Sequence, residues 1–322
     1  MNIAITLNPE VPPETLLEIV QLAEALGFSH CYLGDEGFIR DIYVILASLA
    51  RVTKQIQLGP GITNPYTRHP VVTAAAIASL DELSGGRAFL GFGAGGSMVL
   101  EPMGLARVSP LTACREAMEI IRLLWQGEPV NYQGQHFQLK EAQLQFAVRP
   151  ELELHWAARG PKMLALGGEL ANVIMLHGIP FFELAEVVAI ARQAAHQAGR
   201  TVRLQYAVPL VYDKASLEGI RVRTAYRLVD STEPVRKRIG ITPELYNELR
   251  YLVTTKGAKA AARLVSDDVL SHYTLQGDVK SCAASLRELV RTYGLDGLTF
   301  SISDFSKAQE LLKYAADIIA HL

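Results

Sequence analysis

The sequence predicts an α/β protein, a TIM (β/α)8 barrel with a helical insertion after the seventh strand. Short apolar segments alternate with segments of helical periodicity along nearly all of the 322 residues, and no linker or low-complexity stretch separates them. The apolar segments are continuous runs rather than alternating patterns, as expected for parallel strands that are buried on both faces. We therefore expect residues 1–322 to form a single domain, with a doubly wound open sheet as the alternative architecture.

The first half of the chain contains four strand–helix units. Each strand is an apolar run bordered by polar or glycine-rich residues. The first helix has apolar residues at helical spacing and ends at Gly27, and Asp41 is suited to cap the second helix. The predicted strands are 3–7, 31–33, 56–58 and 88–92, and the helices that follow them are 13–26, 42–52, 71–83 and 109–125.

The second half repeats this order, with two interruptions. Residues 128–148 predict a β-hairpin, because Gly134 lies between segments that contain aromatic residues. Residues 213–276 are mostly helical and follow the seventh strand, so we expect a mobile lid over the mouth of the barrel. The predicted strands are 152–158, 173–176, 202–211 and 297–302, and the helices are 161–171, 182–198, 281–292 and 307–322.

Composition excludes several classes of partner. The chain is 49% hydrophobic and 20% charged, with a formal net charge of -2, so we expect neither a nucleic-acid partner nor a membrane surface. The first residues predict a strand rather than a signal peptide, and no apolar run is long enough to span a bilayer. The three cysteines have neither metal-binding nor redox spacing, so we predict no metal site. We expect a cytoplasmic protein that binds a small-molecule substrate and forms a homodimer or a higher homo-oligomer.

The segment at the end of the third strand contains the largest group of candidate ligand-binding residues in the chain. Residues 57–70 read QLGPGITNPYTRHP, an apolar strand that runs into glycines, polar side chains and prolines before the next helix. Glycine lets a ligand approach the backbone closely, and proline fixes the path of the chain. Because the active sites of barrels form at the carboxyl ends of the strands, we expect a ligand here. The candidate residues in this stretch are Gly61, Ile62, Thr63 and Asn64.

A glycine-rich segment follows the fourth strand. Gly91, Gly93 and Gly96 match the dinucleotide-binding pattern GxGxxG, but we reject this interpretation. The next helix does not begin at the third glycine, because residues 101–104 intervene, and no acidic strand end follows about 20 residues later. In a barrel, the same glycines, which lie on both sides of Ala94, would instead let a flat ring lie against the backbone.

Charged or polar residues follow four other strands. Arg159, Gly160 and Lys162 surround the start of a helix and predict an anion site, with a solvated helix start as the alternative. Asp35 and Glu36 are paired carboxylates that can donate a proton or orient a ring, although a structural role is also open. Asn8 and His177 follow the first and sixth strands and are candidates for contact with a substrate.

These motifs resemble the bacterial luciferase-like superfamily, and most of all its coenzyme F420-dependent branch of the methylenetetrahydromethanopterin reductase type. The likeness covers residues 1–212 well. It implies a TIM barrel, a cis peptide bond at Gly61–Ile62, and an acidic Asp35 near the deazaflavin head. It also implies that Gly93–Gly95 lie beside the cofactor and that Gly160 with its neighbours holds the phosphate. The motifs are LGDE at 33–36, GPGITNPYTRHP at 59–70, LDELSGGR at 80–87, LGFGAG at 90–95 and AARGP at 157–161.

Two positions depart from the resemblance. The methanopterin reductases carry a glutamate at the end of the first strand, where this chain has Leu7 and Asn8. Many F420-dependent relatives have Asp-His after the second strand, where this chain has Asp35 and Glu36. The identity of the proton donor therefore stays open between these two carboxylates.

The predicted function is F420-dependent hydride transfer to or from an organic substrate. Glu36 or Asp35 would handle the proton, and Thr63 and Asn64 would bind the cofactor head or the substrate. An FMN-dependent monooxygenase and a catalytically inactive flavin-binding barrel are the alternatives. A set of basic residues in the lid could meet the acidic tail of F420 or could form a solvated face; it comprises Arg221, Arg223, Arg227, Arg236, Lys237 and Arg238.

Overall fold

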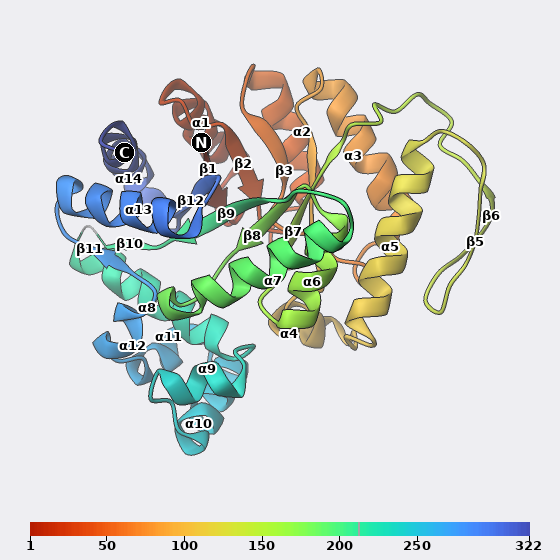
Figure 1. Cartoon of the computed structure of the whole chain (residues 1–322). Coiled ribbons are helices and arrows are strands. Elements are labelled where there is room, and N and C mark those ends of the chain that lie inside the picture. Colours follow the sequence, from red (N-terminus) through yellow and green to blue (C-terminus); the bar gives the residue numbers. More distant parts are fainter. Residues whose placement is uncertain (212) are drawn as a thin grey trace.

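The computed structural model describes residues 1–211 and 213–322. Its core is a sheet of eight parallel strands in the order β3-β2-β1-β12-β9-β8-β7-β4, surrounded by helices (Figure 1). This order is that of consecutive strand–helix units, as the alternation in the sequence predicts. The strands are β1 Asn2–Leu7, β2 His30–Leu33, β3 Gln57–Pro60, β4 Phe89–Gly93, β7 Glu153–Ala157, β8 Val173–Leu176, β9 Arg203–Val208 and β12 Gly297–Ile302.

The sheet closes into a barrel between β3 and β4. The pairing there consists of two isolated bridges, Leu58 with Ala88 and Thr63 with Phe92. Thr63 N donates to Gly91 O over 3.0 Å, and Gly93 N donates to Thr63 O over 3.1 Å. The prediction of a barrel is thereby confirmed, and the open sheet is wrong. Between the two bridges the chain leaves the ladder, and the Gly61–Ile62 peptide is cis, as the resemblance implied.

The outer helices bury their apolar sides against the strands. Cys31 is fully buried in this core, as its position in an apolar strand indicates. Asp41 caps the second helix, because its side chain accepts from the amides of Tyr43 and Val44. The helices are α1 Pro13–Ala25, α2 Ile42–Val52, α3 Pro70–Ser84, α5 Pro110–Trp125, α6 Pro161–Leu170, α7 Leu184–Gln197, α13 Val279–Tyr293 and α14 Ala308–Ala320.

The predicted hairpin is an antiparallel pair that projects from the side of the barrel (Figure 1). It consists of β5 Val130–Gln133 and β6 Gln138–Ala142. The buried carboxylate of Glu116 in α5 accepts hydrogen bonds from the three successive amides of residues 135–137, at 2.6, 2.8 and 3.2 Å. These bonds lower the pKa of Glu116 against the opposing effect of burial, and they fix the turn to the barrel.

The seventh strand ends earlier than the sequence predicts. We expected one strand over 202–211, but β9 stops at Val208, because Pro209 has no N–H to donate to a ladder. The next residues form β10 Leu210–Val211, which pairs in parallel with β11 Leu275–Gln276 in a separate small sheet. The predicted single strand was therefore wrong, because it breaks at Pro209 and its last two residues belong to another sheet.

The helical insertion lies between β10 and β11, as predicted. Its helices have an apolar core of their own that includes Leu228, Ile239, Leu249, Val253 and Leu270. This separate core explains how a segment outside the barrel holds its shape. The helices are α8 Lys214–Leu228, α9 Glu233–Arg238, α10 Pro243–Lys256, α11 Ala258–Ala261 and α12 Asp267–Ser271.

The segment after β4 contains a helical turn that the sequence did not predict. α4 Ser97–Leu100 begins directly after Gly96, and a 3-10 turn, Glu101–Met103, follows it. One of our two grounds for rejecting a dinucleotide site was therefore wrong. The other ground holds, because Glu116, which lies at the required distance, is in the middle of α5 and binds the hairpin.

Three polar side chains from β2 and β7 form a hydrogen-bonded chain inside the barrel. The Tyr32 hydroxyl lies 2.7 Å from His155 Nδ1, and His155 Nε2 lies 3.2 Å from the Glu153 carboxylate. Because a carboxylate only accepts, the Nε2 of His155 carries the proton and Nδ1 accepts from Tyr32. The hydrogen bond from His155 and the neighbouring Arg203 lower the pKa of Glu153 to about 2.

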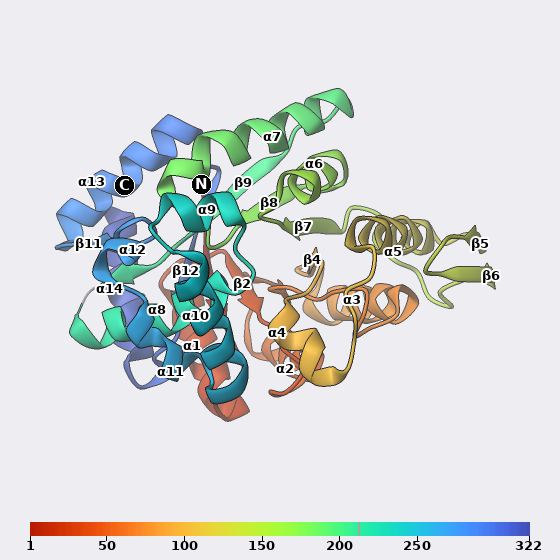
Figure 2. The ribbon, with the colours of Figure 1, turned by 90° about the horizontal axis from the view of Figure 1, so that it is seen from below.

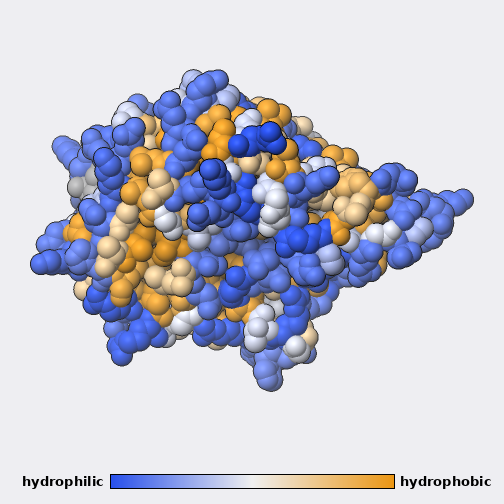
Figure 3. Space-filling view, turned by 90° about the horizontal axis from the view of Figure 1, so that it is seen from above, coloured by the Kyte–Doolittle hydropathy of each residue, from blue (hydrophilic) through white to orange (hydrophobic). Residues whose placement is uncertain are grey.

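Within the described residues, none of the helices combines the length and the apolar character that crossing a bilayer requires. The face opposite the insertion is mostly hydrophilic, with apolar patches between the helices (Figure 3). The hairpin extends from this body as a largely hydrophilic arm.

Candidate active site

The candidate residues lie at the carboxyl ends of the barrel strands, on one face of the molecule. The insertion and α4 lie on this same face (Figure 2). Because all barrel strands are parallel, their last residues converge there. In strand order the candidates are Asn8 after β1, Asp35 and Glu36 after β2, Thr63 and Asn64 after β3, Gly93–Gly95 at the end of β4, Arg159 after β7 and His177 after β8.

Asp35 is joined to the loop after β3. The Thr63 hydroxyl donates a hydrogen bond of 2.8 Å to its carboxylate. Burial raises the pKa of Asp35, while the bond from Thr63 and the charge of Arg68 lower it. The buried phenol of Tyr43 in α2 faces this pair, and burial together with the Asp35 charge raises the pKa of Tyr43. The sequence analysis missed Tyr43, because α2 covers the barrel and only the fold brings its hydroxyl to the site.

Glu36 is joined to the end of the first strand. Asn8 Nδ2 donates to its carboxylate over 3.4 Å. Gly34 makes this approach possible, since a Cβ there would lie 2.2 Å from Asn8 Oδ1. Burial raises the pKa of Glu36, and the charges of Arg227 and Arg223 lower it. Asn8, at the end of the first strand, therefore holds the Glu36 carboxylate from the loop after the second strand.

Two glycines at the end of β4 allow close packing against β3. A Cβ at Gly91 would lie 1.8 Å from Pro60 O, and one at Gly93 would lie 2.5 Å from the side chain of Ile62. These two glycines therefore make room for the irregular end of β3, and the contact of Gly93–Gly95 with a flat ring stays a prediction. Asn64 Oδ1 accepts from the amides of residues 66 and 67 at 2.9 and 3.0 Å, so it shapes its own loop.

Two arginines come together near the start of α6. Arg159 Nη1 donates to the carbonyl oxygen of Arg227 in α8 over 3.1 Å. Burial lowers the pKa of each guanidinium; the charge of Arg159 also lowers the pKa of Arg227, while the charge of Asp230 raises that of Arg159. No ion pair joins either of them to a carboxylate in the part of the chain that the structure describes. Two partly buried cations without a direct counter-ion are suited to bind an anion.

His177 lies beside this pair. Burial and the charges of Arg227 and Arg159 lower its pKa to about 3, so its ring is neutral at physiological pH. Its Nε2 is buried and has no hydrogen-bond partner. A neutral imidazole with an unused nitrogen can donate to or accept from a ligand, which supports its selection as a candidate contact.

Lys162 does not join the anion site. Its side chain is exposed and lines a separate surface depression with Arg115 of α5 and Glu169 of α6. The prediction that places Lys162 with Arg159 therefore has no geometric support. Gly160, the N-cap of α6, does lie beside Arg159, and the first amides of a helix have no partner within it.

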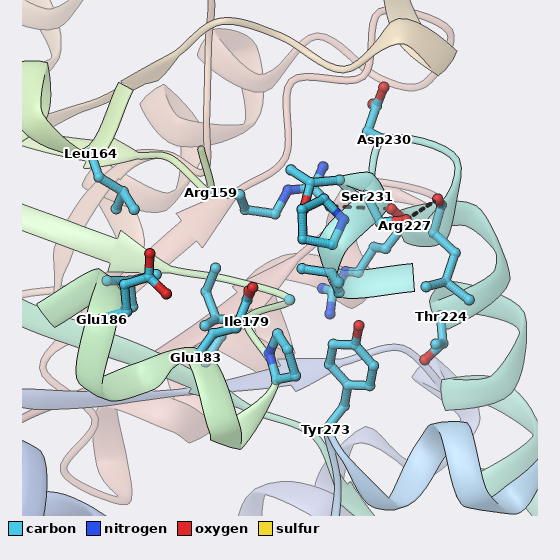
Figure 4. Close-up of a pocket in the computed structure, with 18 of the residues that line it drawn as sticks. Arg159, Leu164, Ile179, Glu183, Glu186, Thr224, Arg227, Asp230, Ser231 and Tyr273 are labelled. Atoms are coloured by element: carbon cyan, nitrogen blue, oxygen red, sulfur yellow. Dashed lines mark hydrogen bonds between the residues drawn. The ribbon is translucent and has the colours of Figure 1, made fainter. Parts of the chain in front are cut away.

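A cavity of about 410 Å³ adjoins the arginine pair (Figure 4). It lies between α6 and α7 on one side and α8 and α9 of the insertion on the other. Arg159 and Arg227 line it, whereas Asp35 and Glu36 do not. The cavity therefore adjoins the site on the side where we predicted the phosphate. Its apolar walls are formed by Leu164, Ile179, Val187, Ile190, Leu228 and Val235.

Hydrogen bonds join the insertion to the segment after β4, and we call this contact the latch. The amide and the hydroxyl of Ser97 donate to the Asp230 carboxylate at 3.2 and 2.9 Å. Arg107 lies 3.7 Å from the same carboxylate and also donates to Gly95 O over 2.9 Å. The sequence analysis missed Asp230, because 133 residues separate it from Ser97 and no local pattern links them.

The basic residues of the insertion divide into two groups. Arg223 and Arg227 of α8 face the site. Arg221 instead binds Asp267, Arg236 stacks on Tyr246, and Arg238 lies 4.0 Å over the ring of Phe182. Of the six basic residues that the sequence offered for an acidic tail, Arg221, Arg236 and Arg238 are thus engaged by other side chains, and Arg223 and Arg227 lie near the Glu36 carboxylate.

We expect Asp230→Ala to loosen the insertion. Loss of the two Ser97 bonds should increase amide exchange in α8, α9 and residues 94–100 by about tenfold. Hydrogen exchange followed by mass spectrometry measures this directly. Asp267→Ala is the matched control, since Asp267 pairs with Arg221 away from the barrel. Equal exchange in both variants would show that the latch does not hold the insertion.

Comparisons with known proteins agree with the resemblance that the sequence motifs indicate. A family model described as luciferase-like monooxygenase matches residues 2–296. The chain is 32% identical to the 5,10-methylenetetrahydromethanopterin reductase of Archaeoglobus fulgidus, over 90% of each chain. It is similar to the solved coenzyme F420 dependent tetrahydromethanopterin reductase from Methanopyrus kandleri, with a TM-score of 0.88, 26% identity and 99% of both chains covered. An F420-dependent secondary alcohol dehydrogenase, in complex with an F420-acetone adduct, shares the fold, with a TM-score of 0.79, 20% identity and 97% of both chains covered.

Proposed function

The chain belongs to the luciferase-like monooxygenase family, and on this premise we propose that it is an oxidoreductase that uses coenzyme F420. The observation that carries the proposal is the likeness over 99% of the chain to a coenzyme F420 dependent reductase. When bound, F420 supplies hydride transfer at C5 of its deazaflavin ring. The chain itself would bind and orient the ring, exclude water and move a proton.

The residues present fit such a cofactor. Arg159 and Arg227 are partly buried cations that form no ion pair within the described residues, and the free amides at the start of α6 lie beside Arg159. The two guanidinium groups and these amides would hold the phosphate group of the cofactor. The irregular end of β3, with Ile62 and Thr63, would lie against the ring. Gly95 lies next to Asn64 and takes a positive φ of 71°, a conformation that favours glycine at this close approach.

We assign the proton to Glu36 and the orientation of the ring to Asp35. Burial raises the pKa of both carboxyls, which favours a protonated form that can donate. The Thr63 hydroxyl engages Asp35 over 2.8 Å, while Asn8 donates to Glu36 over a longer 3.4 Å. Asn8 and His177 then remain as contacts for the substrate, an organic molecule that accepts or donates hydride.

Binding and turnover test this proposal together. The purified protein is titrated separately with F420, FMN and NADPH, and binding is followed by the fluorescence of each compound. We expect F420 to bind most tightly and reduced F420 to be oxidised by an acceptor of the methylene-pterin class. FMN binding with oxygen consumption would support an FMN-dependent monooxygenase instead. Tight binding of a flavin without turnover would support an inactive barrel.

The cellular context is part of the proposal. Val44 on α2 and Val72 on α3 are 65% and 49% exposed on neighbouring helices, which supports association into a homodimer or a higher homo-oligomer. Three cysteines are free and buried, which supports a reducing cytoplasm. Residues 1–322 would then act as one unit, with the insertion as the lid of its site.

A further inference from the structure

The cavity beside the arginine pair has charges of opposite sign on facing walls. Arg159 and Arg227 come from the end of β7 and from α8, whereas Glu183 and Glu186 come from the start of α7 (Figure 4). The carboxylates of Glu183 and Glu186 lie on the side of the cavity across from Arg227. A ligand whose anionic group binds the arginines would therefore extend along apolar walls toward two carboxylates.

These two carboxylates have no direct counter-ion. In the described segments, neither Glu183 nor Glu186 forms an ion pair or a side-chain hydrogen bond. Burial and the charge of Glu186 raise the pKa of Glu183, and Arg238 lowers it. Arg238 is itself exposed and occupied over the ring of Phe182. The wall is therefore a site of negative charge that only a distant cation offsets.

The other polar groups of the cavity include a third carboxylate and neutral hydroxyl groups. Asp230 is engaged by Ser97 and Arg107, and its carboxylate adds further negative charge on the rim. Hydroxyl groups of Thr224 and Tyr273 are neutral donors. The walls between the two ends are apolar, whereas Glu186 is exposed and Glu183 is partly buried, so salt can screen the charges of these two carboxylates.

We propose that Glu183 and Glu186 select the length of the cofactor tail, so that the protein prefers F420 with no glutamate over F420 with a long glutamate chain. The inference rests on the proposed function. The F420 tail continues beyond the phosphate through lactate into a chain of glutamates, and each glutamate adds a negative charge. The phosphate and the lactate match the cationic end of the cavity, and the glutamates meet its carboxylates.

The test is a comparison of affinities. F420 without glutamate and F420 with a long glutamate chain are titrated into the full-length protein, and the dissociation constants are read from deazaflavin fluorescence. At low ionic strength we expect the form without glutamate to bind about tenfold more tightly. This preference should shrink as salt is added, because it arises from like charges.

Variants assign the preference to the two residues. Glu183→Gln combined with Glu186→Gln should tighten binding of the long-tailed form by about tenfold and leave the form without glutamate unchanged. Glu186→Lys should tighten the long-tailed form further. Glu82→Gln, an exposed change on α3 away from the cavity, is the matched control and should alter neither constant.

Three results would count against the inference or its premise. Equal or tighter binding of the long-tailed form to the wild type would overturn it and would point to capture of the tail by Arg238 and its neighbours. An unchanged ratio in the double glutamine variant would also overturn it. Failure of both F420 forms to bind, in a protein that binds FMN, would instead refute the proposed function.

Discussion

Replacing Glu36 with glutamine is expected to lower the rate of F420-dependent turnover by about 10²–10⁴-fold, because glutamine cannot donate or accept the proton that accompanies hydride transfer. Glutamine keeps an oxygen for the Asn8 amide, which lies 3.4 Å from the carboxylate in the native chain. The affinity for F420 should therefore stay within about twofold of the wild type. Stopped-flow oxidation of reduced F420 separates the two quantities.

The pH dependence of stability gives an independent check on Glu36. Its pKa in the folded state lies above the ordinary glutamate value, with burial as the main cause. The folded state therefore holds this proton more tightly than the unfolded state, and stability falls as the pH rises through the two pKa values. The glutamine variant lacks this fall. Its melting temperature should match that of the wild type at low pH and exceed it at neutral pH.

Asp35→Asn is the comparison that separates the two carboxylates. Asparagine can still accept the hydrogen bond of Thr63, which spans 2.8 Å in the native chain. If Glu36 moves the proton, Asp35→Asn should retain a much larger share of the turnover and should mainly weaken cofactor binding. The opposite pattern, with turnover lost in Asp35→Asn and kept in Glu36→Gln, would transfer the proton to Asp35.

Arg87→Met is expected to destabilise the protein by about 3–5 kcal/mol, because it leaves several buried carbonyl groups without a donor. The Arg87 side chain is 8% exposed and makes five hydrogen bonds. They run to the end of α2, the start of β3 and the end of α3, so that one guanidinium ties three elements. The acceptors are Ala50 O, Thr53 O, Thr53 Oγ1, Ile56 O and Ser84 O.

Chemical denaturation measures the effect of Arg87→Met as a change in the free energy of unfolding. Arg51→Met is the matched control, because Arg51 is exposed at the end of α2, and we expect a change within about 0.5 kcal/mol. A loss smaller than about 1 kcal/mol in Arg87→Met would show that water replaces the side chain as donor.

The motif that ends at Arg87 has a structural role. It ends the segment LDELSGGR, which supported the resemblance and lies far from the site. Asp81 in the same segment binds Arg149 through two hydrogen bonds of 2.9 and 2.8 Å and accepts from the amide of Ala88. This motif holds the closing pair of strands in place, whereas the motifs at the strand ends carry the chemistry.

The sequence by itself determined the barrel and the face on which its site lies. Strand and helix are local patterns, so the alternation, the hairpin at Gly134 and the cap at Asp41 can all be read from neighbouring residues. Parallel strands bring their carboxyl ends together by topology alone, and this gathered Asn8, Glu36 and the other candidates at one end. The cis peptide at Gly61–Ile62 came from the resemblance of the motif, not from the periodicity.

Only the tertiary structure decided which of these side chains meet. Lys162 and Arg159 are three positions apart, yet one faces solvent beside α5 and the other the cavity, because the two residues lie on different sides of the start of α6. Arg227 and Asp230 reach the site from the insertion, and the position of Asp230 depends on contacts with Ser97 across 133 residues of sequence. Contacts between residues this far apart follow from packing, and packing leaves no pattern in neighbouring residues that could have revealed them.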